Sequence, residues 1–307
     1  MRISSNTIYD AGVSAMQQQS AKLLQAQQQI ATGRRILTPA DDPIGAAQAL
    51  QVTQSQTMNA QYSTNAGSAS DSLTLEESVL GSITSLLQDV KTIAVNAGNG
   101  ALNSKDRAIL ATDLSGRYQQ LLALANTVDG NGQYLFSGYQ GGVRPFTERA
   151  PGMVDYNGDQ GQRLIQISNS EQLAVSDAGA DVFQRIPNAG GGYQDVFKTI
   201  DDLAQLLQTS PGGAGLTNGL ATAQTNIDSA LDNVISVRTS AGSRLKELES
   251  VQNTGEDRAL QYSQTLSRLQ DVDYAKAAAE LAQQQVSLEA AQKSFVKVAG
   301  LSLFNYL

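Results

Sequence analysis

The pattern in this sequence that comes nearest to a metal site is formed by Asp155, Asn157 and Asp159, which alternate as at the start of a calcium loop. A calcium loop of the EF-hand type also requires glycine at its sixth position and glutamate at its twelfth. This chain has Gln160 and Gln166 at those positions. The spacing therefore argues against a metal site. We expect Asn157 and the glycine after it to form the turn of a β-hairpin.

Other catalytic patterns are missing from the sequence. It contains no Cys and no His, which excludes thiol nucleophiles, histidine bases and the usual zinc ligands. The glycine-rich stretches 98–100, 190–192 and 212–213 lack the residues that follow nucleotide-binding loops, so we interpret them as turns or linkers. Adjacent carboxylates such as Glu76 and Glu77 diverge on a helix, and we expect both on solvated faces. The sequence predicts no catalytic residue, cofactor or metal, although a two-carboxylate hydrolase stays open as an alternative.

Charge and composition restrict the partners. The 307 residues include 21 Lys and Arg against 29 Asp and Glu, a net charge of -8, so nucleic acid is not an expected partner. Only 16% of residues are charged, against about 25% in ordinary globular proteins, and polar and small residues replace them. Such a surface suits broad polar contact with other chains. The amino-terminal residues lack a secretory apolar run, and no long apolar stretch occurs, so we expect neither a Sec signal nor membrane insertion.

Both ends of the sequence carry the alternating four- and three-residue spacing of a coiled-coil seam. The first seam comprises Tyr9, Val13, Met16, Ser20, Leu23, Gln27 and Ile30. The second comprises Tyr274, Ala278, Leu281, Gln285, Leu288, Gln292, Phe295 and Ala299. We expect the two ends to pair, but loosely in a monomer, because few large apolar residues offset an ordering cost of about 1–2 kcal/mol per residue. An ordinary helix pair within the chain and packing between subunits both fit this pattern; the glutamine triplets favour the second.

A bend or hinge is expected between the first seam and the next helix, because glycine and two prolines interrupt the helical pattern. The candidate residues of this hinge segment are Gly33, Arg34, Arg35, Pro39, Asp41, Asp42 and Pro43. Either Thr38 with Pro39, or Asp42 with Pro43, can supply the N-cap and first residue of the following helix. The two arginines are expected to form ion pairs with the two aspartates, within a subunit or between neighbours.

The rest of the chain alternates helical and β patterns. We expect helices over 44–96 and 103–128, a short helix near 200–207 and a long helix through 220–248. The first of these ends in an apolar seam of Leu80, Ile83, Leu87, Val90, Ala94 and Ala97. Residues 133–192 instead show short β-type runs separated by glycine-containing turns. The runs expected to be strands are 134–136, 144–147 and 163–167.

The sequence thus predicts a mainly α-helical, elongated protein with a small β insertion, organised in three parts. Residues 1–43 and 271–307 are expected to form a terminal coiled coil. Residues 44–132 and 193–270 are expected to form a helical rod domain, and 133–192 an outer β domain. Sequence-distant halves supply the rod, so the middle of the chain must be an insertion.

Four segments resemble the family of bacterial flagellar hook-filament junction proteins, FlgL, which is flagellin-like. Their sequences are MRIS at 1–4, GRRILTPADDP at 33–43, DVDYA at 271–275 and GLSLFNYL at 300–307. Flagellins have related segments but usually lack the Thr-Pro-Ala-Asp-Asp-Pro form and the Leu-Phe-x-Tyr-Leu end. The resemblance covers both terminal regions, whereas the β insertion matches only by type.

The resemblance implies a structural adaptor and not an enzyme, located outside the cell at the hook-filament junction. It implies export through the flagellar type III apparatus without a Sec signal, with a chaperone on the C-terminal region. The implied partners are further copies in a ring, the other hook-associated junction protein on the hook side, and flagellin on the filament side. Subunit packing is expected through Val13, Met16, Leu23, Ile30, Leu281, Leu288, Phe295, Leu301, Leu303 and Phe304. The alternatives are flagellin or a minor filament subunit, and an unrelated soluble enzyme or helical effector.

Overall fold

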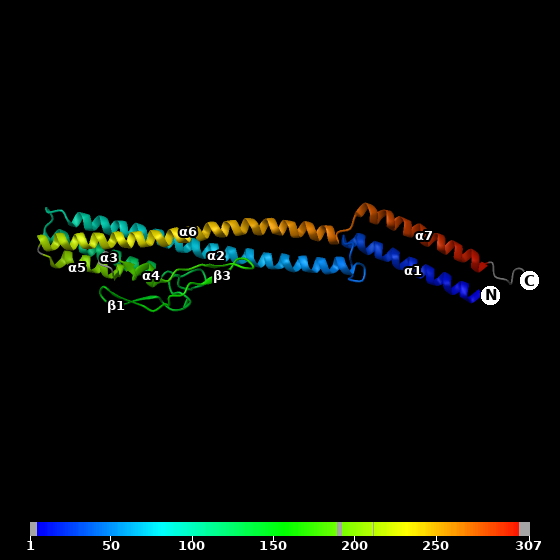
Figure 1. The fold of residues 1–307 in the computed structure, drawn as a ribbon, viewed down its shortest axis with the longest axis horizontal. Helices are drawn as coiled ribbons and strands as arrows, with labels where there is room; N and C mark the ends of the chain where they lie inside the picture. Colours follow the sequence, from blue (N-terminus) through cyan, green and yellow to red (C-terminus); the bar gives the residue numbers. More distant parts are fainter. Residues whose placement is uncertain (1–4, 189–191, 211, 301–307) are drawn as a thin grey trace, which may run out of the picture. The chain divides into compact units, whose positions relative to one another are not determined.

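The structure, a computed structural model, describes residues 5–188, 192–210 and 212–300. Its helices are α1 (Ser5–Thr32), α2 (Pro43–Ala97), α3 (Ser104–Ala125), α4 (Gly179–Phe183), α5 (Val196–Thr209), α6 (Ala214–Gln270) and α7 (Tyr274–Gly300). Its strands are β1 (Phe146–Ala150), β2 (Met153–Tyr156), β3 (Leu164–Gln166), β4 (Gln172–Ala174), β5 (Ile186–Pro187) and β6 (Tyr193–Gln194). The expected mainly helical fold with a small β insertion is confirmed (Figure 1). Within the described ranges, no helix is long and apolar enough to cross a membrane.

The chain divides into two compact units. The first unit contains the described residues up to Asn59 and those from Asp257 onward, and the second contains Ala60–Glu256. Helices α2, with 55 residues, and α6, with 57, each contribute to both units. The finer three-part division expected from the sequence stays a prediction.

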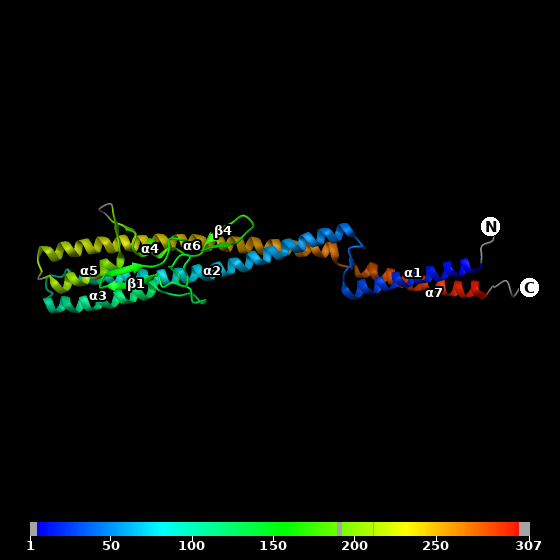
Figure 2. The same ribbon diagram turned by 90° about the horizontal axis from the view of Figure 1, so that it is seen from below.

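In the first unit, α1 and α7 lie side by side in both views (Figures 1 and 2). Helix α1 ends at Gly33, whose φ of 70° is the left-handed conformation that glycine adopts at helix ends without steric cost. Helix α7 begins after Asp273, whose carboxylate accepts hydrogen bonds from the amides of Ala275 at 3.0 Å and Lys276 at 3.2 Å. The expected pairing of the two ends is therefore present within one chain.

The second unit is built around an apolar core shared by α2, α3, α5 and α6. All six residues of the α2 seam expected from the sequence are buried. Four phenylalanine rings, Phe136, Phe146, Phe183 and Phe197, join the β insertion to these helices and are buried completely or almost so. Phe146 lies at the centre of this aromatic cluster, with ring centroids 5.2 Å from Phe183 and 5.3 Å from Phe197.

The β insertion consists of three separate antiparallel hairpins and not of one sheet: β1 pairs with β2, β3 with β4 and β5 with β6. The expected turn at Asn157 is wrong. Strands β1 and β2 are instead joined through Gly152, whose φ of 71° allows the tight reversal, and Asn157 follows β2. The expected strand at 134–136 is also wrong, because Tyr134 forms only an isolated bridge with Val128.

Several helix boundaries differ from those expected. Helix α3 ends at Ala125, not at 128, because Asn126 serves as its C-cap. Helix α5 begins earlier than expected, at Val196, because the Asp195 side chain caps it by accepting hydrogen bonds from two amides. Asp195 is a typical capping residue, but the apolar pattern used to place this helix began only at residue 200.

Candidate functional site

The terminal helices pair through the large apolar residues that the sequence singled out. The described members of that set are half-buried in the α1–α7 pair: Val13, Met16, Leu23, Ile30, Leu281, Leu288 and Phe295. The Phe295 ring also lies 5.1 Å from the ring of Tyr9, measured between centroids. Leu301, Leu303 and Phe304 lie outside the described residues. A role for any of these residues between subunits stays a prediction.

The polar members of the expected seams are misplaced by one residue. Ser20, Gln27, Gln285 and Gln292 are exposed, and the residues that turn inward are Gln19, Ala26, Ala277, Gln284 and Ala291. The expected seam and the observed one contain the same large apolar residues, so periodicity alone could not decide which of the neighbouring polar residues faces inward. The inward glutamines meet: Gln19 Nε2 donates to the Gln284 side-chain oxygen, and to its main-chain oxygen at 3.4 Å. The seam thus alternates half-buried large apolar residues with small and polar groups, and buries less apolar area than a fully apolar seam would.

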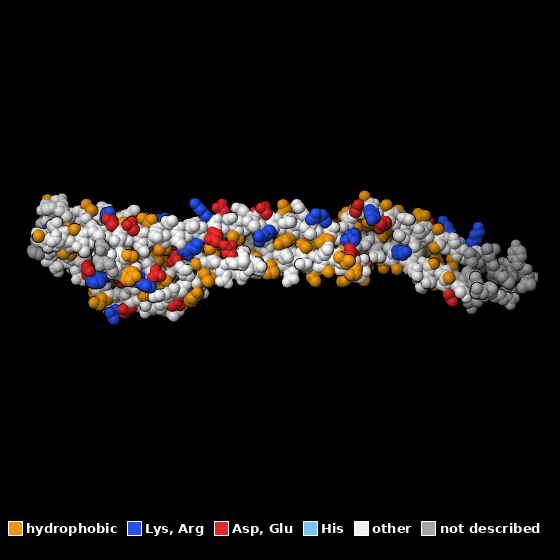
Figure 3. Space-filling view, in the orientation of Figure 1, with side chains coloured by type: hydrophobic (Ala, Val, Ile, Leu, Met, Phe, Trp, Pro, Cys, Tyr) orange, Lys and Arg blue, Asp and Glu red, His pale blue; other side chains and the backbone are white. Residues whose placement is uncertain are grey.

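The first unit leaves large apolar side chains exposed. Tyr9 and Tyr274 are the first members of the two expected seams and are exposed, whereas the other residues of this group lie off the seams. On α1 and α7 they are Tyr9, Leu24, Tyr274, Val286 and Val296. On the adjoining parts of α2 and α6 they are Ile44, Leu50, Met58 and Leu260. Val286 and Val296 are 67% and 70% exposed, and Figure 3 shows hydrophobic side chains beside charged ones along α1 and α7. Exposed large apolar side chains in this number are typical of a protein contact. We call these nine residues the outer surface.

Sequence reasoning missed the outer surface because it followed only the seams. The available signal was the presence of apolar residues off the seam, such as Leu24 beside Leu23.

The hinge segment is held by Arg35, which contacts three elements of the first unit. Its amide donates to the Gln270 carbonyl at 2.6 Å, and its Nη2 donates to the Leu269 carbonyl at 2.8 Å, both at the end of α6. Its Nη1 forms an ion pair with Asp42 Oδ2 at 3.2 Å, and its carbonyl accepts from Gln29 Nε2 of α1 at 2.7 Å. One residue therefore connects α1, the start of α2 and the end of α6.

The two aspartates of the hinge have different roles. Asp42 caps α2 by accepting from the Gly45 amide at 2.9 Å, with Pro43 as the first helical residue, as one of the two expected alternatives proposed. Asp41 closes the turn before it, accepting from the Thr38 amide at 2.7 Å. These amide hydrogen bonds, together with the Arg35 bond to Asp42, lower the pKa of each carboxyl below its usual value. Both side chains are charged at neutral pH and hold the bend.

Of the two expected arginine ion pairs, only that of Arg35 is found among the described residues. Arg34 instead forms an isolated β-bridge with Asp271. Next to it, the Gly33 carbonyl accepts from the Val272 amide at 2.9 Å, and the Tyr274 hydroxyl oxygen lies 3.0 Å from the position a Cβ would occupy on Gly33. Glycine is required here both by its positive φ and by this close approach.

We expect replacement of Arg35 by alanine to loosen the hinge segment without unfolding the second unit. The substitution removes the hydrogen bond from Arg35 Nη2 to the Leu269 carbonyl and the exposed ion pair with Asp42, which together contribute about 1–2 kcal/mol. Hydrogen exchange of residues 33–42 should accelerate about tenfold relative to the unchanged chain. Arg34→Ala is the matched control. Equal exchange rates in the Arg35 and Arg34 variants would contradict the connecting role of Arg35.

The residues considered for other chemistry are used structurally. Asp159 accepts from the amides of Tyr139 at 2.9 Å and Gly161 at 2.8 Å, Asp155 pairs with Arg149, and Asn157 donates to the side chain of a threonine. Within the described part of the chain, no group of acidic residues is arranged to hold a metal ion. The expectation that Glu76 is solvated is wrong, because Glu76 is 1% exposed. The Glu77 side chain is 37% exposed and forms an ion pair with Arg238 of α6.

Comparison with known proteins identifies the family. Residues 3–141 match the model of the bacterial flagellin N-terminal helical region. The chain is 35% identical to flagellar hook-associated protein 3 of Salmonella typhimurium over 317 aligned positions, which cover 99% of both chains. The chain belongs to the hook-associated protein 3 family. Flagellar hook-associated protein 3 of Escherichia coli matches it to the same extent, with 35% identity and 99% coverage of both chains.

Solved structures of hook-associated proteins share the fold. A putative flagellar hook-associated protein of Vibrio parahaemolyticus superimposes with a TM-score of 0.68 at 20% identity, covering 75% of this chain and 100% of that one. The flagellar junction protein FlgL of Legionella pneumophila gives a TM-score of 0.63 at 22% identity, covering 73% and 100%. Flagellin of Listeria innocua is 24% identical over 79% of the chain. The expected resemblance is confirmed: the chain is a flagellar hook-associated protein with a flagellin N-terminal helical region.

Proposed function

We propose that this hook-associated protein is a structural, non-enzymatic adaptor that joins the flagellar hook to the filament. The observation that carries the proposal is the outer surface of the first unit, which leaves nine large apolar side chains exposed. In a member of this family, such a surface is best used by neighbouring subunits. Further copies of the chain occupy it around a ring, with another hook-associated junction protein on one side and flagellin on the other.

The composition of the seam between α1 and α7 is evidence that the two ends become ordered only when subunits assemble. The inward glutamine pair and the inward alanines bury little apolar area, so the pair gains little stability in isolation. Contacts from neighbouring subunits then offset the entropy of ordering the two ends. We therefore propose that the ends order fully on assembly, after export of the chain by the flagellar type III apparatus, and that an export chaperone covers the C-terminal region beforehand.

Deletion of the gene in its host tests the proposed function. We expect cells with hooks but without filaments, and monomeric flagellin released into the medium, because export continues while attachment fails. Electron microscopy of the cells and an immunoassay of the medium provide the two measurements, and a plasmid-borne copy should restore filaments.

The same experiment separates the proposal from the alternative of a filament subunit. Loss of filaments without released flagellin would identify the chain as filament material, and normal filaments would refute an obligatory adaptor role. The higher identity and full coverage of the match to hook-associated protein 3, compared with flagellin, favour the adaptor.

A further inference from the structure

Glu76 of α2 is buried in the second unit without an ionic partner of its own. Its Oε1 accepts a hydrogen bond from the Asp177 amide at 3.0 Å, just after β4. Its Oε2 has no hydrogen-bond partner among the described residues, although the side chain is 1% exposed. An ionised carboxylate in such a position is strongly destabilised unless a cation pairs with it. The geometry therefore favours the neutral carboxyl.

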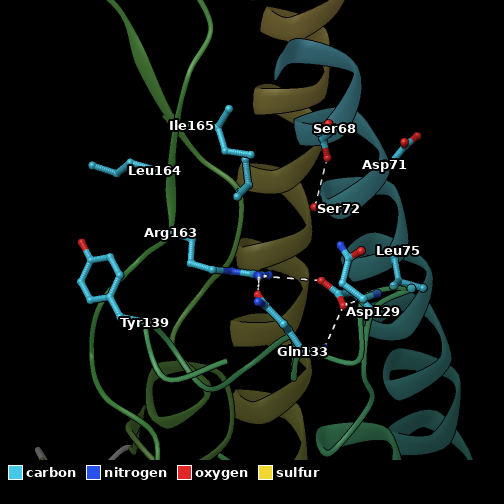
Figure 4. A pocket seen from close by; sticks show the side chains of 13 residues that line it. Ser68, Asp71, Ser72, Leu75, Asp129, Gln133, Tyr139, Arg163, Leu164 and Ile165 are labelled. Atoms are coloured by element: carbon cyan, nitrogen blue, oxygen red, sulfur yellow. Dashed lines mark hydrogen bonds and ion pairs between the residues drawn. The ribbon is translucent and has the colours of Figure 1, made fainter. Parts of the chain in front are cut away.

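The cations near Glu76 are committed to other groups. Arg244 of α6 forms an ion pair with Asp177, with its Nη2 2.5 Å from Asp177 Oδ2. Arg163, just before β3, forms an ion pair with Asp129 at 3.7 Å, and its Nη1 donates to the Gln133 side-chain oxygen at 2.7 Å. Figure 4 shows this arginine directed at those two partners, on the wall of an open hollow of about 690 Å³. Each arginine thus already pairs with an aspartate, although Arg163 Nε and Nη2 are buried without a hydrogen-bond partner among the described residues.

The charged groups that face Glu76 are therefore Asp177, Arg244 and Arg163. Asp129 is the ion-pair partner of Arg163. Burial, reinforced by the negative charge of Asp177, raises the pKa of Glu76 from its usual 4.5 to about 8. The amide hydrogen bond from Asp177 and the charges of the two arginines act in the opposite direction but do not outweigh burial. Glu76 consequently keeps its proton at neutral pH in the folded chain.

Glu76 lies where the β3–β4 hairpin is attached to the helices. Ile167 and Leu173 of the hairpin pack with residues of α2 and α6 in a small apolar cluster. Asn65 of α2 also donates to the Gln166 carbonyl at 2.8 Å. This cluster is separate from the main core, so the hairpin has its own limited set of attachments. The protonation state of Glu76 therefore affects one of the few contacts that attach the β3–β4 hairpin to α2 and α6.

We propose that Glu76 is a proton-dependent latch, which in its neutral form holds the β3–β4 hairpin on α2 and α6 and which loosens that hairpin when it ionises. The closed state keeps the Glu76 proton to higher pH than the open state, where the carboxyl is solvated. The closed state therefore binds more protons between the two pKa values, and its stability falls as the pH rises through that window. At pH values below and above this window, Glu76 causes no further change in the stability of the closed state.

Hydrogen exchange of the full-length chain tests the latch. Protection factors of amides in residues 164–177, corrected for the intrinsic rate, should fall by up to about tenfold per pH unit between pH 5 and 8, and then level off. In Glu76→Gln, a neutral side chain of the same shape, the protection factors should be independent of pH over this range. The matched control is Glu77→Gln, which removes the neighbouring carboxylate that pairs with Arg238 and should retain the pH dependence.

Titration of the Glu76 carboxyl in the unchanged chain tests the proposal without relying on variants, which could misfold. Infrared difference spectra of the unchanged chain should contain a protonated carboxyl band that is lost as the pH rises through the upper end of the same range. The proposal is overturned if the unchanged chain shows constant protection, if Glu76→Gln retains the slope of the unchanged chain, or if that band is lost near pH 4.5 with the ordinary carboxyls.

Discussion

The Leu288→Asp variant should be exported but not incorporated into flagella, while the thermal unfolding of its second unit stays unchanged. Leu288 is half-buried between α7 and α1, in a seam that also contains small and polar groups. A charged group at this position prevents the two helices from closing, and without the closed pair the outer surface is not presented to a neighbour. Incorporation is measured by immunoelectron microscopy of flagella, and the second unit by calorimetry of the purified monomer.

Two further variants locate the contact surface. Val286→Asp places the same charge on the outer surface, where Val286 is 67% exposed, and should also block incorporation while leaving the α1–α7 pair closed. Ser287→Asp adds the charge at an exposed polar position between them and should incorporate normally. A Leu288→Asp variant with a destabilised second unit would instead show that Leu288 belongs to an internal packing site. Normal assembly of Val286→Asp would remove that residue from the subunit contact.

Phe146→Ala should destabilise the second unit by about 3–5 kcal/mol, the largest effect expected from one substitution in that unit. Phe146 is completely buried and lies against Tyr156, Phe183 and Phe197, with centroid distances of 5.2, 5.2 and 5.3 Å. Its removal leaves a cavity where β1 meets α5, because neighbouring rings fill it only partly. Urea unfolding followed by circular dichroism gives the change in unfolding free energy.

An exposed aromatic residue of the same insertion provides the control. Tyr193 is 65% exposed, and its ring lies 5.6 Å from the Arg185 guanidinium carbon, an exposed cation–π contact that contributes about 0.5–1 kcal/mol. Tyr193→Ala should therefore change stability by no more than that amount. Equal losses in the two variants would mean that the aromatic cluster does not hold the insertion on the helices.

Apolar periodicity made most of the helical fold predictable. In α2 the six seam residues between Leu80 and Ala97 are all buried, because their spacing matches the helical period. In the terminal seams, only the inward orientation of the large apolar residues could be predicted from the sequence. Gln19 and Gln284 face inward while Ser20 and Gln285 do not, and no difference in hydrophobicity separates these neighbours. Their register depends on the partner helix.

The β insertion and the buried carboxyl were harder to predict, because both depend on contacts between distant residues. The Asn157-Gly158 pair has the composition of a hairpin turn, but the reversal occurs at Gly152, where β1 and β2 also pack on the helices. Glu76 has the composition of a solvated helix face, and its burial depends on Asp177, 101 residues further along the chain. Local sequence contains neither signal.

The division of the β insertion into three unconnected hairpins bears on how this region can change between related proteins. Each ladder of main-chain hydrogen bonds is complete within one pair of strands, and each pair rests on side chains of the helices or of the aromatic cluster. Lengthening or removing one hairpin breaks no ladder of another, so the chain can tolerate insertions and deletions here one hairpin at a time. The same independence means that the region, excised from its helices, has no continuous sheet to hold it and should not fold as a transferable module.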